Sequence, residues 1–345
     1  MIKYCSLFIL SFCCLKLLSN DHSVTIGFGS CAYQDRVQPI WATIMQHNPD
    51  LFVLMGDNVY IDSTDEQDMK NAYQELAQKE HFQQFRNQVP IIATWDDHDY
   101  GINDGGKNFS AKHKAKQAFI EFFDYPEISQ LKSKSQGIYH TKWLKQNDLD
   151  IQIILIDTRW DRDDLTLSYL TPEQRKQLRL GPYQPNSDNT RQLLGDQQWQ
   201  WLKKELQKAA DVKILVSSIQ VIPEYSGWEL WANFPDERKK LLDMLSEYSN
   251  NNLVIVSGDV HRGELSQIKY NGKTMYEVTS SGLAGRVYPA APNKNRFGQA
   301  LIKQNYGLIE VNNVDQKTIE LQASLYSDDG KLFNQFVMNL ENKKL

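Results

Sequence analysis

Four short polar motifs each follow directly on an apolar run that is rich in β-branched residues. They read Gly29-Ser30-Cys31, Gly56-Asp57-Asn58-Val59-Tyr60, Trp95-Asp96-Asp97-His98-Asp99-Tyr100-Gly101 and Ser257-Gly258-Asp259-Val260-His261. Thiolate, phenolate and imidazole suit iron or zinc, whereas carboxylate and amide oxygens suit calcium, magnesium or manganese. A set that mixes both kinds predicts two neighbouring metal sites, one softer and one harder, that share Asp57.

The charges of these side chains favour the same interpretation. One thiolate and three carboxylates bring a charge of about −4 to one place, and a phenolate would make it about −5. The groups belong to Cys31, Asp57, Asp97, Asp259 and Tyr60. Like charges at contact distance cannot all ionise unless cations lie between them. A trivalent and a divalent ion together would balance the sum.

Each motif alone has a simpler interpretation. A Gly-Asp pair that ends a strand is usually a turn. The sequence Asp96-Asp97-His98-Asp99 could be a helix N-cap followed by a solvated acidic turn. Asp259 and His261 could be a hydrogen-bonded pair in the core. If the four motifs did not share a site, each of them would have to follow a predicted strand by coincidence. We therefore expect a metal centre.

The elements that must position these motifs alternate along the chain. Predicted strands cover residues 24–29, 51–55, 91–94, 151–156, 213–217 and 253–256. Predicted helices cover residues 38–46, 65–78, 110–123, 195–210 and 235–249. Such alternation indicates a layered α/β domain. Ligands of open α/β sheets bind beyond the carboxyl ends of strands, so the four motifs should meet on one rim.

The last part of the chain changes to strands alone, at residues 274–279, 308–311, 319–325 and 332–338. The final two flank Ser327-Asp328-Asp329-Gly330, which predicts a hairpin. Irregular stretches at 161–189, 223–235 and 283–297 are long enough to be typical of functional loops. Neither a repeat nor a linker divides the chain. We therefore expect a single domain, residues 21–345, after an N-terminal leader.

Residues 1–20 are typical of an export signal. Lys3 supplies the positive start, and the uncharged run from Tyr4 to Leu15 is too short to span a bilayer comfortably. Lys16 interrupts the run, so an uncleaved anchor or a buried first helix is the alternative. We expect an exported protein, located in the periplasm, the secretory pathway or the extracellular space.

The distribution of the four cysteines supports Cys31 as a ligand. Cys5, Cys13 and Cys14 lie in the leader, so a processed protein keeps only Cys31. A disulfide within the mature chain is then excluded. A lone thiol in an oxidising compartment is a liability unless it is buried or bound to a metal. The alternative for Cys31 is a small buried apolar residue.

The overall composition excludes several classes of protein. Of the 345 residues, 41% are hydrophobic and 23% are charged, an ordinary globular mixture. Because 38 Lys and Arg stand against 43 Asp and Glu, no domain-wide basic field indicates nucleic-acid binding. No apolar run after the leader is long enough for a transmembrane span. The absence of a Gly-x-Ser-x-Gly elbow and of a Walker loop gives no sign of covalent catalysis or nucleotide-dependent phosphoryl transfer.

The order Cys, Gly-Asp-x-x-Tyr, Asp-Asp-His-[Asp/Glu] and Gly-Asp-x-His resembles the PhoD-like alkaline phosphatases, a branch of the calcineurin-like metallophosphoesterases. Supporting matches are Asp157-Thr158-Arg159, Leu194-Gly195-Asp196-Gln197-Gln198-Trp199 and Ser280-Ser281-Gly282. The resemblance spans residues 24–310. It implies a metallophosphoesterase-type layered α/β/β/α sandwich with mixed sheets, and hydrolysis of a phosphate ester.

The resemblance also implies a division of the ligands between two metals. The residues that look like iron ligands are Cys31, Asp57, Tyr60 and His261, with Asp57 as the bridge. Asp97 and Asp259 look like ligands of a second site, where the wider superfamily has asparagine and histidine. A further superfamily histidine is replaced by the stretch Ser217-Ser218-Ile219-Gln220, which favours a harder ion than zinc. We expect Fe³⁺ with Ca²⁺, and Mn, Mg or Zn are alternatives.

The expected reaction is attack of a metal-activated water on a phosphate ester. His98 matches the superfamily histidine at its position and is the expected general acid, with Asp99 orienting it. The planar guanidinium of Arg159 could clamp phosphate oxygens, and Arg162 is a weaker candidate for the same role. A surface ion pair is the alternative for both arginines. Asn103 is a further candidate oxygen ligand or phosphate contact.

Aromatic residues concentrate in the predicted loop 223–235, which carries Tyr225, Trp228, Trp231 and Phe234. They could stack a base, grip an acyl chain or pack as a lid, and we take Tyr225 and Trp228 as candidate substrate contacts. The expected substrate is a small-molecule, lipid or polymer phosphate ester, and the expected enzyme is a phosphomonoesterase that could also cleave diesters. A phosphodiesterase or phospholipase is the alternative on the same scaffold. A non-catalytic metal- or phosphate-binding protein is the alternative from another class, although such a protein needs no general acid such as His98.

Overall fold

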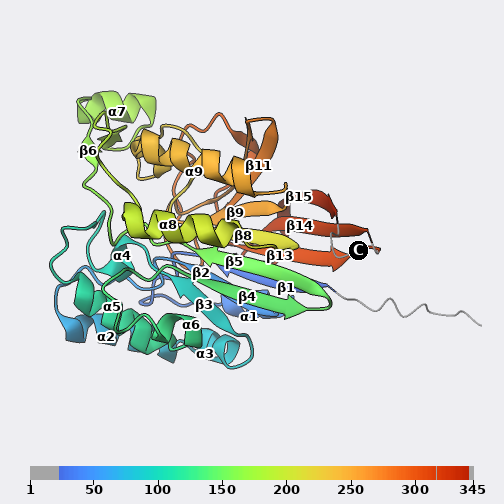
Figure 1. Cartoon of the computed structure of the whole chain (residues 1–345). Coiled ribbons are helices and arrows are strands. Elements are labelled where there is room, and N and C mark those ends of the chain that lie inside the picture. Colours follow the sequence, from blue (N-terminus) through green and yellow to red (C-terminus); the bar gives the residue numbers. More distant parts are fainter. Residues whose placement is uncertain (1–22, 316, 342–345) are drawn as a thin grey trace, which may run out of the picture.

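The computed structural model describes residues 23–315 and 317–341, so the predicted leader lies outside the described residues. Figure 1 shows two sheets packed face to face, with helices on both outer faces. The first sheet has the order β15 (Leu332–Glu341), β14 (Thr318–Ser327), β13 (Asn305–Asn313), β1 (Val24–Gly29), β2 (Leu51–Met55) and β3 (Ile91–Thr94). The second has the order β12 (Arg296–Leu301), β10 (Gly263–Tyr270), β11 (Lys273–Ser280), β9 (Leu253–Ser257), β8 (Val212–Val216), β5 (Leu149–Leu155) and β4 (His140–Gln146).

The helices divide between the two outer faces. The first sheet is covered by α1 (Ile40–Met45), α2 (Glu66–Gln78), α3 (Glu80–Arg86), α5 (Lys112–Phe123) and α6 (Pro126–Ser129), and the second by α8 (Gly195–Leu206) and α9 (Pro235–Tyr248). Three small elements lie in loops: α4 (Asp97–Tyr100), a 3₁₀ turn at Trp231–Asn233, and α7 (Pro172–Leu178) between the short paired strands β6 (Thr166–Leu167) and β7 (Tyr183–Gln184). The predicted α/β/β/α sandwich is confirmed.

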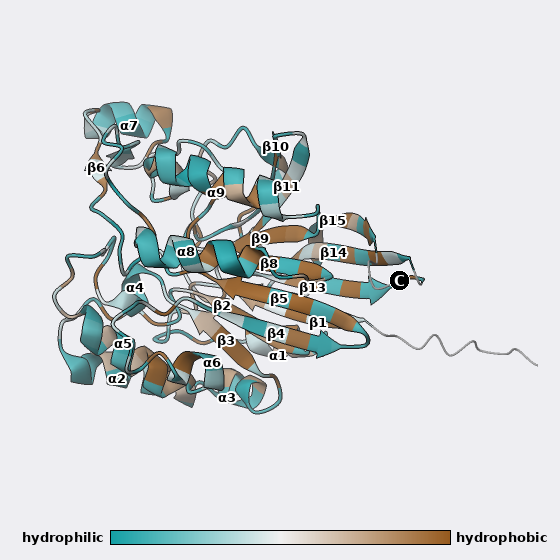
Figure 2. Ribbon diagram, viewed as in Figure 1, coloured by the Kyte–Doolittle hydropathy of each residue, from teal (hydrophilic) through white to brown (hydrophobic). Residues whose placement is uncertain are grey.

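The core consists of three apolar layers. Alternate residues of each central strand face the opposite sheet or the helices; in β2, Val53 faces β5 and β8, whereas Phe52 and Leu54 face the helices of the first sheet. A third layer packs the second sheet against α8 and α9. Figure 2 shows the hydrophobic residues gathered in the central strands. Strands buried on both faces are apolar throughout, which is why the runs are so clear in the sequence.

The predicted strands are confirmed, and the bounds of β1, β2 and β3 agree with the prediction at both ends. The predicted helices are also present, although most are shorter than expected. Sequence analysis missed α3 and α7 and the strands β4, β10 and β12. These strands alternate apolar with charged or polar residues and are partly exposed, so their apolar content is too low to stand out.

The rim that the four motifs share is made by both sheets of the sandwich. The first three motifs end β1, β2 and β3, which run parallel in the first sheet, whereas the fourth ends β9 of the second sheet. A parallel bridge between Ser30 and Ser281 joins the sheets at this edge. The amides of Ala284 and Gly285 donate to the carbonyl oxygen of Cys31 at 3.0 and 2.9 Å. The motifs of the two sheets are thereby held together.

Candidate metal centre

The backbone is strained where four of the predicted ligands stand. Cys31, Asp57, Asp259 and His261 have φ angles of 60°, 51°, 69° and 51°. Left-handed backbone is uncommon for residues other than glycine, and it concentrates at functional sites, where the surrounding structure compensates its cost. Four ligand candidates in this conformation on one rim indicate that the chain is bent to aim these side chains.

The first two loops are fixed to each other by main-chain contacts. The amide of Cys31 donates to the carbonyl of Gly56 at 3.2 Å, and that of Ala32 donates to the carbonyl of Asp57 at 2.9 Å. Gly56 has a φ of 106°, and a Cβ there would lie 2.5 Å from the Cβ of Asp96. Only glycine allows this approach, which brings the second and third motifs together.

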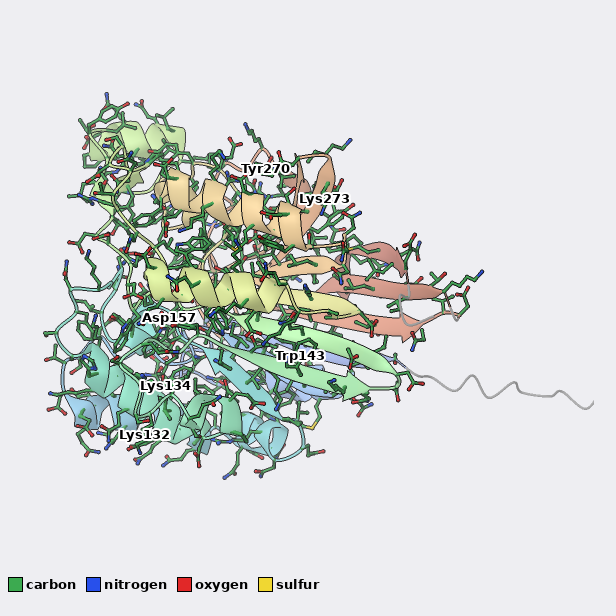
Figure 3. The ribbon with its side chains drawn as sticks, in the orientation of Figure 1. Lys132, Lys134, Trp143, Asp157, Tyr270 and Lys273 are labelled. Carbon is green, nitrogen blue, oxygen red and sulfur yellow. The ribbon has the colours of Figure 1, made fainter. Side chains whose placement is uncertain are left out.

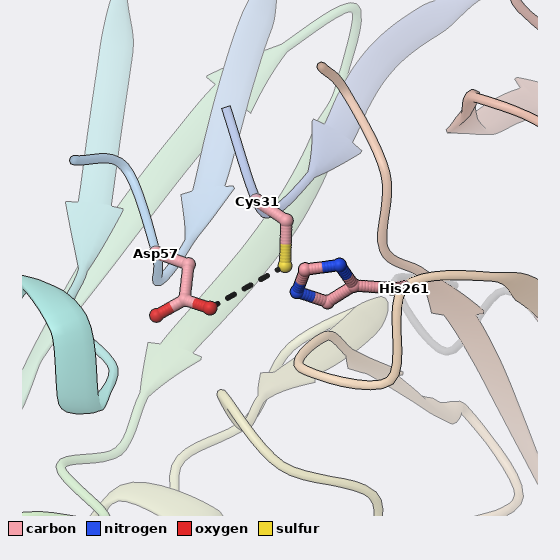
Figure 4. A group of neighbouring side chains, drawn as sticks. All are labelled: Cys31, Asp57 and His261. Carbon is pink, nitrogen blue, oxygen red and sulfur yellow. Dashed lines mark hydrogen bonds between the residues drawn. The ribbon is translucent and has the colours of Figure 1, made fainter. Parts of the chain in front are cut away.

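Cys31, Asp57 and His261 form the softer part of the site, with potential ligand atoms within 4.8 Å of one another (Figure 4). The Sγ of Cys31 lies 3.5 Å from Oδ2 of Asp57. The hydroxyl of Tyr60 donates to the same Oδ2 at 3.1 Å and lies 3.1 Å from Nε2 of His261. Ser281, which the sequence suggested only as part of a supporting motif, places its Oγ 3.1 Å from the thiol.

His261 is held in the tautomer that a metal ligand requires. Its Nδ1 lies 2.7 Å from the carbonyl oxygen of Arg286, which can only accept, so Nδ1 carries the proton. The lone pair of Nε2 therefore faces Asp57 and Tyr60. Burial lowers the pKa of His261 and favours the neutral ring. A hydrogen bond of this kind from the second ring nitrogen is the usual way in which proteins orient a ligating histidine.

Four carboxylates form the harder part of the site. Oxygens of Asp57, Asp96, Asp97 and Asp259 lie within 4.8 Å of one another. Asp96 was not among the predicted ligands, and its Oδ1 accepts from Nε of Arg159 at 2.6 Å and from Oγ of Ser218 at 2.7 Å. A residue of the stretch that replaces the superfamily histidine thus reaches the site, but it does so as a hydroxyl that supports Asp96.

The acids of the centre disfavour one another's charged forms. Burial, and then the charges of Asp97 and Cys31, raise the pKa of Asp57 well above its usual range. Burial and the charges of Asp96 and Asp97 do the same for the pKa of Asp259. Burial raises the pKa of the Cys31 thiol to about 12. Cations between these groups would reverse the balance, so the donor set fits a pair of metal ions.

His98 lies at the edge of the cluster, and its partner differs from the expected one. Its Nδ1 is 3.0 Å from Oδ1 of Asp62, and its ring packs on Tyr60 with centroids 4.2 Å apart. Asp99 is buried instead and accepts from the amides of Asn58 and Asp96, both at 3.0 Å. The expectation that Asp99 orients His98 is therefore wrong.

The physical reason lies in the short helix α4. Asp99 occupies its third position, where the side chain turns back to the free backbone amides at the helix start. Asp62 follows Tyr60 by two residues and stands in left-handed backbone, with a φ of 46°. Its proximity to the Gly-Asp-x-x-Tyr motif is a sequence signal that could have identified it.

Arg159 and Arg162 are completely buried, which excludes the surface ion pair considered for them. Arg159 pairs with Asp96 and, through Nη1, with Glu229 at 2.8 Å. Arg162 pairs with the other oxygen of Glu229 at 3.0 Å and donates to the carbonyl of Gly105 at 2.8 Å. A direct phosphate clamp stays a prediction, since in this structure Arg159 reaches the centre through Asp96.

The supporting motif Asp157-Thr158-Arg159 has a structural role at its first residue. Asp157 lies beside α8 (Figure 3), and its carbonyl accepts from the amide of Gln198 at 2.8 Å. Its carboxylate accepts from Nε1 of Trp95 at 2.8 Å and from the amides of Arg159 and Ile138 at 2.8 and 2.9 Å. Asp157 thereby fixes the start of the loop that carries Arg159.

The predicted substrate contacts stand further out. Asn103 contacts Asp62 through its amide, at 3.1 Å, and Asp104 through its side chain, at 2.7 Å. Tyr225 is half-buried and donates to the carbonyl of Tyr183 at 3.0 Å. Trp228 is 51% exposed. The other two aromatics of the loop, at positions 231 and 234, pack into the core beside α8 and α9, so packing on the core applies to these two and not to the exposed Trp228.

Two sheets flanked by helices, with soft and hard candidate metal ligands on their shared rim, are the features of a metallophosphoesterase-like fold. The family model described as PhoD-like phosphatase matches residues 26–323, and the chain belongs to this family. Alkaline phosphatase D of Bacillus subtilis (strain 168) is 24% identical over an alignment of 313 residues, and the match covers 77% of this chain. This chain spans only 50% of that relative's length.

Solved structures share the fold. A structure of PhoD superimposes with a TM-score of 0.70 at 17% identity, over 94% of this chain and 71% of the other. A dimetal phosphatase from Danio rerio superimposes with a TM-score of 0.56 at 10% identity, over 92% of this chain and 99% of the other. Within the described residues, no helix has both the length and the apolar character needed to cross a membrane.

Proposed function

We propose that this protein is a metal-dependent phosphoric ester hydrolase that cleaves phosphate monoesters with a metal-activated water. The observation that carries the proposal is the buried rim where Cys31, Tyr60 and His261 meet a group of carboxylates, with His98 at its edge. Membership of the PhoD-like phosphatase family supports it. The leader at residues 1–20 supports the further proposal that the protein is exported.

The donor chemistry favours Fe³⁺ together with Ca²⁺. Thiolate, phenolate and imidazole from Cys31, Tyr60 and His261 would hold the iron, and Asp97 and Asp259 would hold the calcium. Asp57 belongs to both groups of candidate ligands and would contribute to both metal sites. Bound metals would supply positive charge for the phosphoryl oxygens and lower the pKa of a bound water.

His98 is the proposed proton donor to the leaving alkoxide. Its Nδ1 is engaged with Asp62, which leaves Nε2 free to reach a substrate. Burial by itself lowers the pKa of His98, but the hydrogen bond to Asp62 and the charge of Asp57 outweigh it and raise this pKa to about 10. The hydrogen bond to Asp62 favours the protonated ring, which is the form that a general acid needs. Asp62 acts as a positioning residue.

Arg159 supports the centre from behind. Its guanidinium keeps Asp96 in place, and Glu229 holds that guanidinium from the other side. All three side chains are almost completely buried, so water is excluded from the back of the site. The planar fork of Arg159 favours its proposed contact to phosphate, whether direct or by way of the position of Asp96.

The exposed ring of Trp228 favours a second candidate, a phosphodiesterase or phospholipase. An indole at the rim could hold the second substituent of a diester by stacking or apolar contact. A monoester has no such group. The ratio of the two activities in Trp228→Ala therefore separates the candidates: a diesterase loses diester turnover selectively, and a monoesterase does not.

The experiment is hydrolysis of a chromogenic monoester beside its diester, by protein expressed without residues 1–20 and loaded with iron and calcium. We expect turnover, its loss on exhaustive chelation, and a decrease of kcat by about 10²–10⁴ in His98→Ala. Turnover that survives complete removal of metal contradicts the mechanism. Full metal binding without hydrolysis of either substrate, in wild type and His98→Ala alike, supports the non-catalytic alternative.

A further inference from the structure

Exposed apolar side chains gather at the rim end of the molecule. Seven of the twelve large hydrophobic residues that are exposed within the described chain stand on rim loops: Val37, Ile102, Leu167, Tyr169, Leu178, Trp228 and Tyr288. Three of them belong to one excursion, residues 165–184, which contains β6, α7 and β7 and is called the flap below. Apolar side chains concentrated in this way mark an interaction surface.

The flap leaves its own helix without a packing partner. No residue of α7 is buried, although the helix is well formed, with a capping box between Thr171 and Gln174. Tyr169, just before the helix, is 86% exposed, and Leu178 in its last turn is 55% exposed. A seven-residue helix that buries nothing gains little from folding alone. Its apolar side chains are therefore available to another surface.

The charge of the flap is opposite to that of the whole chain. Arg175, Lys176 and Arg179 stand in or beside α7 against the single acid Glu173, whereas the protein carries a net charge of −5. No salt bridge within residues 23–315 and 317–341 uses any of the three cations; the side chain of Arg175 donates to the carbonyl of Leu170 at 2.9 Å, and its charge acts on Glu173. Basic and apolar side chains together are the composition of helices that lie on anionic lipid surfaces.

The base of the flap is fixed to the rim. The hydroxyl of Tyr183 donates to Asp104, whose amide donates to the ligand candidate Asp97 at 2.6 Å. The amide of Tyr183 also donates to the carbonyl of Gly227 at 2.8 Å, directly before Trp228. Figure 1 places α7 and β6 at the same end of the molecule as α4, where the rim lies. Any surface that binds the flap therefore lies close to the metal centre.

We propose that the flap, together with Trp228, docks this protein on an anionic lipid surface. The apolar side chains of Leu167, Tyr169 and Leu178 insert between the headgroups, and the cations of α7 meet the lipid charges. This arrangement turns the rim toward the membrane. The proposal does not depend on hydrolysis, because binding to vesicles is measured without a substrate.

The test measures co-sedimentation of the protein lacking residues 1–20 with vesicles of phosphatidylcholine, alone or mixed with phosphatidylglycerol. We expect binding to the mixed vesicles that weakens as salt is added. The triple variant Leu167→Ser/Tyr169→Ser/Leu178→Ser should bind about tenfold more weakly or worse. Lys176→Glu/Arg179→Glu should lose the preference for the anionic lipid.

The matched control changes exposed apolar residues at another place, in Leu332→Ser/Phe333→Ser/Val337→Ser on β15, and should bind as the wild type does. Circular dichroism and thermal unfolding show whether each variant is folded. Absence of wild-type binding, or equal loss in the flap and β15 variants, overturns the proposal. So does a concentration-dependent dimer in sedimentation velocity that only the flap variants abolish, since the flap would then bind a second copy of this chain.

Discussion

Two regions of this protein bury charge in different ways. The metal centre gathers acids beside acids, whereas Glu264 on β10 lies completely buried between partners of opposite charge. Its carboxylate accepts from Nε of Arg296 at 2.5 Å and from the amide of Gln220 at 2.6 Å, and Arg262 lies 3.6 Å away. Burial raises the pKa of both kinds of acid, but the two arginines outweigh it at Glu264 and lower the pKa there.

The sign of the neighbouring charges distinguishes a structural cluster, such as that of Glu264, from a site that can bind a ligand. At Glu264 the chain supplies the cations itself, so the network is complete and holds β10 and β12 in place. At Asp57, burial and then the charges of Asp97 and Cys31 raise the pKa well above its usual range, and the opposing effect of His98 does not offset them. A buried cluster of like charge favours the binding of cations from outside the chain, and the donor set of this cluster fits metal ions.

Asp57→Ala is the most direct test of the contrast between the metal centre and the Glu264 cluster. We expect activity to decrease by more than about 10³, because the shared ligand of both metals is lost. Metal content measured by inductively coupled plasma mass spectrometry should decrease in parallel. Unfolding of the metal-free variant should need at least as much denaturant as the metal-free wild type, since one of the mutually repelling acids is gone. Retention of both metals would contradict the bridging role.

Glu264→Gln should act on stability and leave the metals in place. Removal of the carboxylate leaves Arg262 and Arg296 partly buried without their partner, which should cost about 3–5 kcal/mol of unfolding free energy. Urea denaturation measures the change, and metal analysis should give the wild-type content. Lys331→Ala breaks an exposed ion pair with Asp329 and is the control, expected to change stability little. Loss of metal in Glu264→Gln would show that the Glu264 cluster and the metal centre depend on each other, and would contradict their separation.

His140 offers a contrast in pH dependence, because it is buried without a charged partner. Its Nδ1 donates to the carbonyl of Ile138 at 2.7 Å, and Nε2 accepts from the hydroxyl of Tyr125 at 2.7 Å. Burial lowers the pKa of His140 to about 4. The folded pKa lies below the unfolded value of about 6.5, so stability is full above pH 6.5 and is lost as the pH falls toward 4.

The expected loss attributable to His140 is about 2 kcal/mol between pH 7 and pH 5. It is obtained as the difference in slope between wild type and His140→Asn, in urea unfolding at several pH values. The other titratable groups are the same in both proteins, so their contributions to the pH dependence cancel in the difference. Parallel slopes for the two proteins would mean that His140 does not stay neutral in the fold.

The smallest effect is expected for Asp62→Asn. An amide keeps the shape of the carboxylate but weakens its hydrogen bond to His98, so kcat should decrease about tenfold with KM and metal content unchanged. Asp62→Glu, which restores the charge, should recover part of the loss. Asp99→Asn is the matched comparison: it should reduce the unfolding temperature, because Asp99 holds backbone amides and not His98. A larger loss of kcat in Asp99→Asn at full stability would return the orienting role to Asp99.

Sequence analysis could predict the strands that end at the centre because β1, β2 and β3 are buried on both faces. It could not assign β9 to a different sheet, since an apolar run carries no record of which strand lies beside it. The same restriction applies to side chains. Arg159 and Glu229 are joined by burial across the fold, and nothing in the local pattern at Glu229 distinguishes it from a solvated acid.

The partner of His98 shows the limit most clearly. Adjacency in the sequence favours Asp99, but the helical turn of α4 points its carboxylate back to the backbone. Left-handed backbone at Asp62 places this residue beside His98, and the pattern of hydrophobic residues does not predict such a turn. Ligand types and their order along the chain are therefore predictable, whereas the groups that orient them depend on loop geometry.

The position of β1 in its sheet has a consequence for the order in which the protein acquires its centre. This strand carries Cys31 at its end and pairs with β2 on one side but with β13 on the other. This strand, the first in the described part of the chain, must wait for residues 305–313 before its second edge is covered, and contacts so distant in sequence form slowly. Because Cys31 follows β1 closely, the strand that positions it is supported on both sides only after β13 has joined the sheet, so we expect metal affinity to develop late in folding.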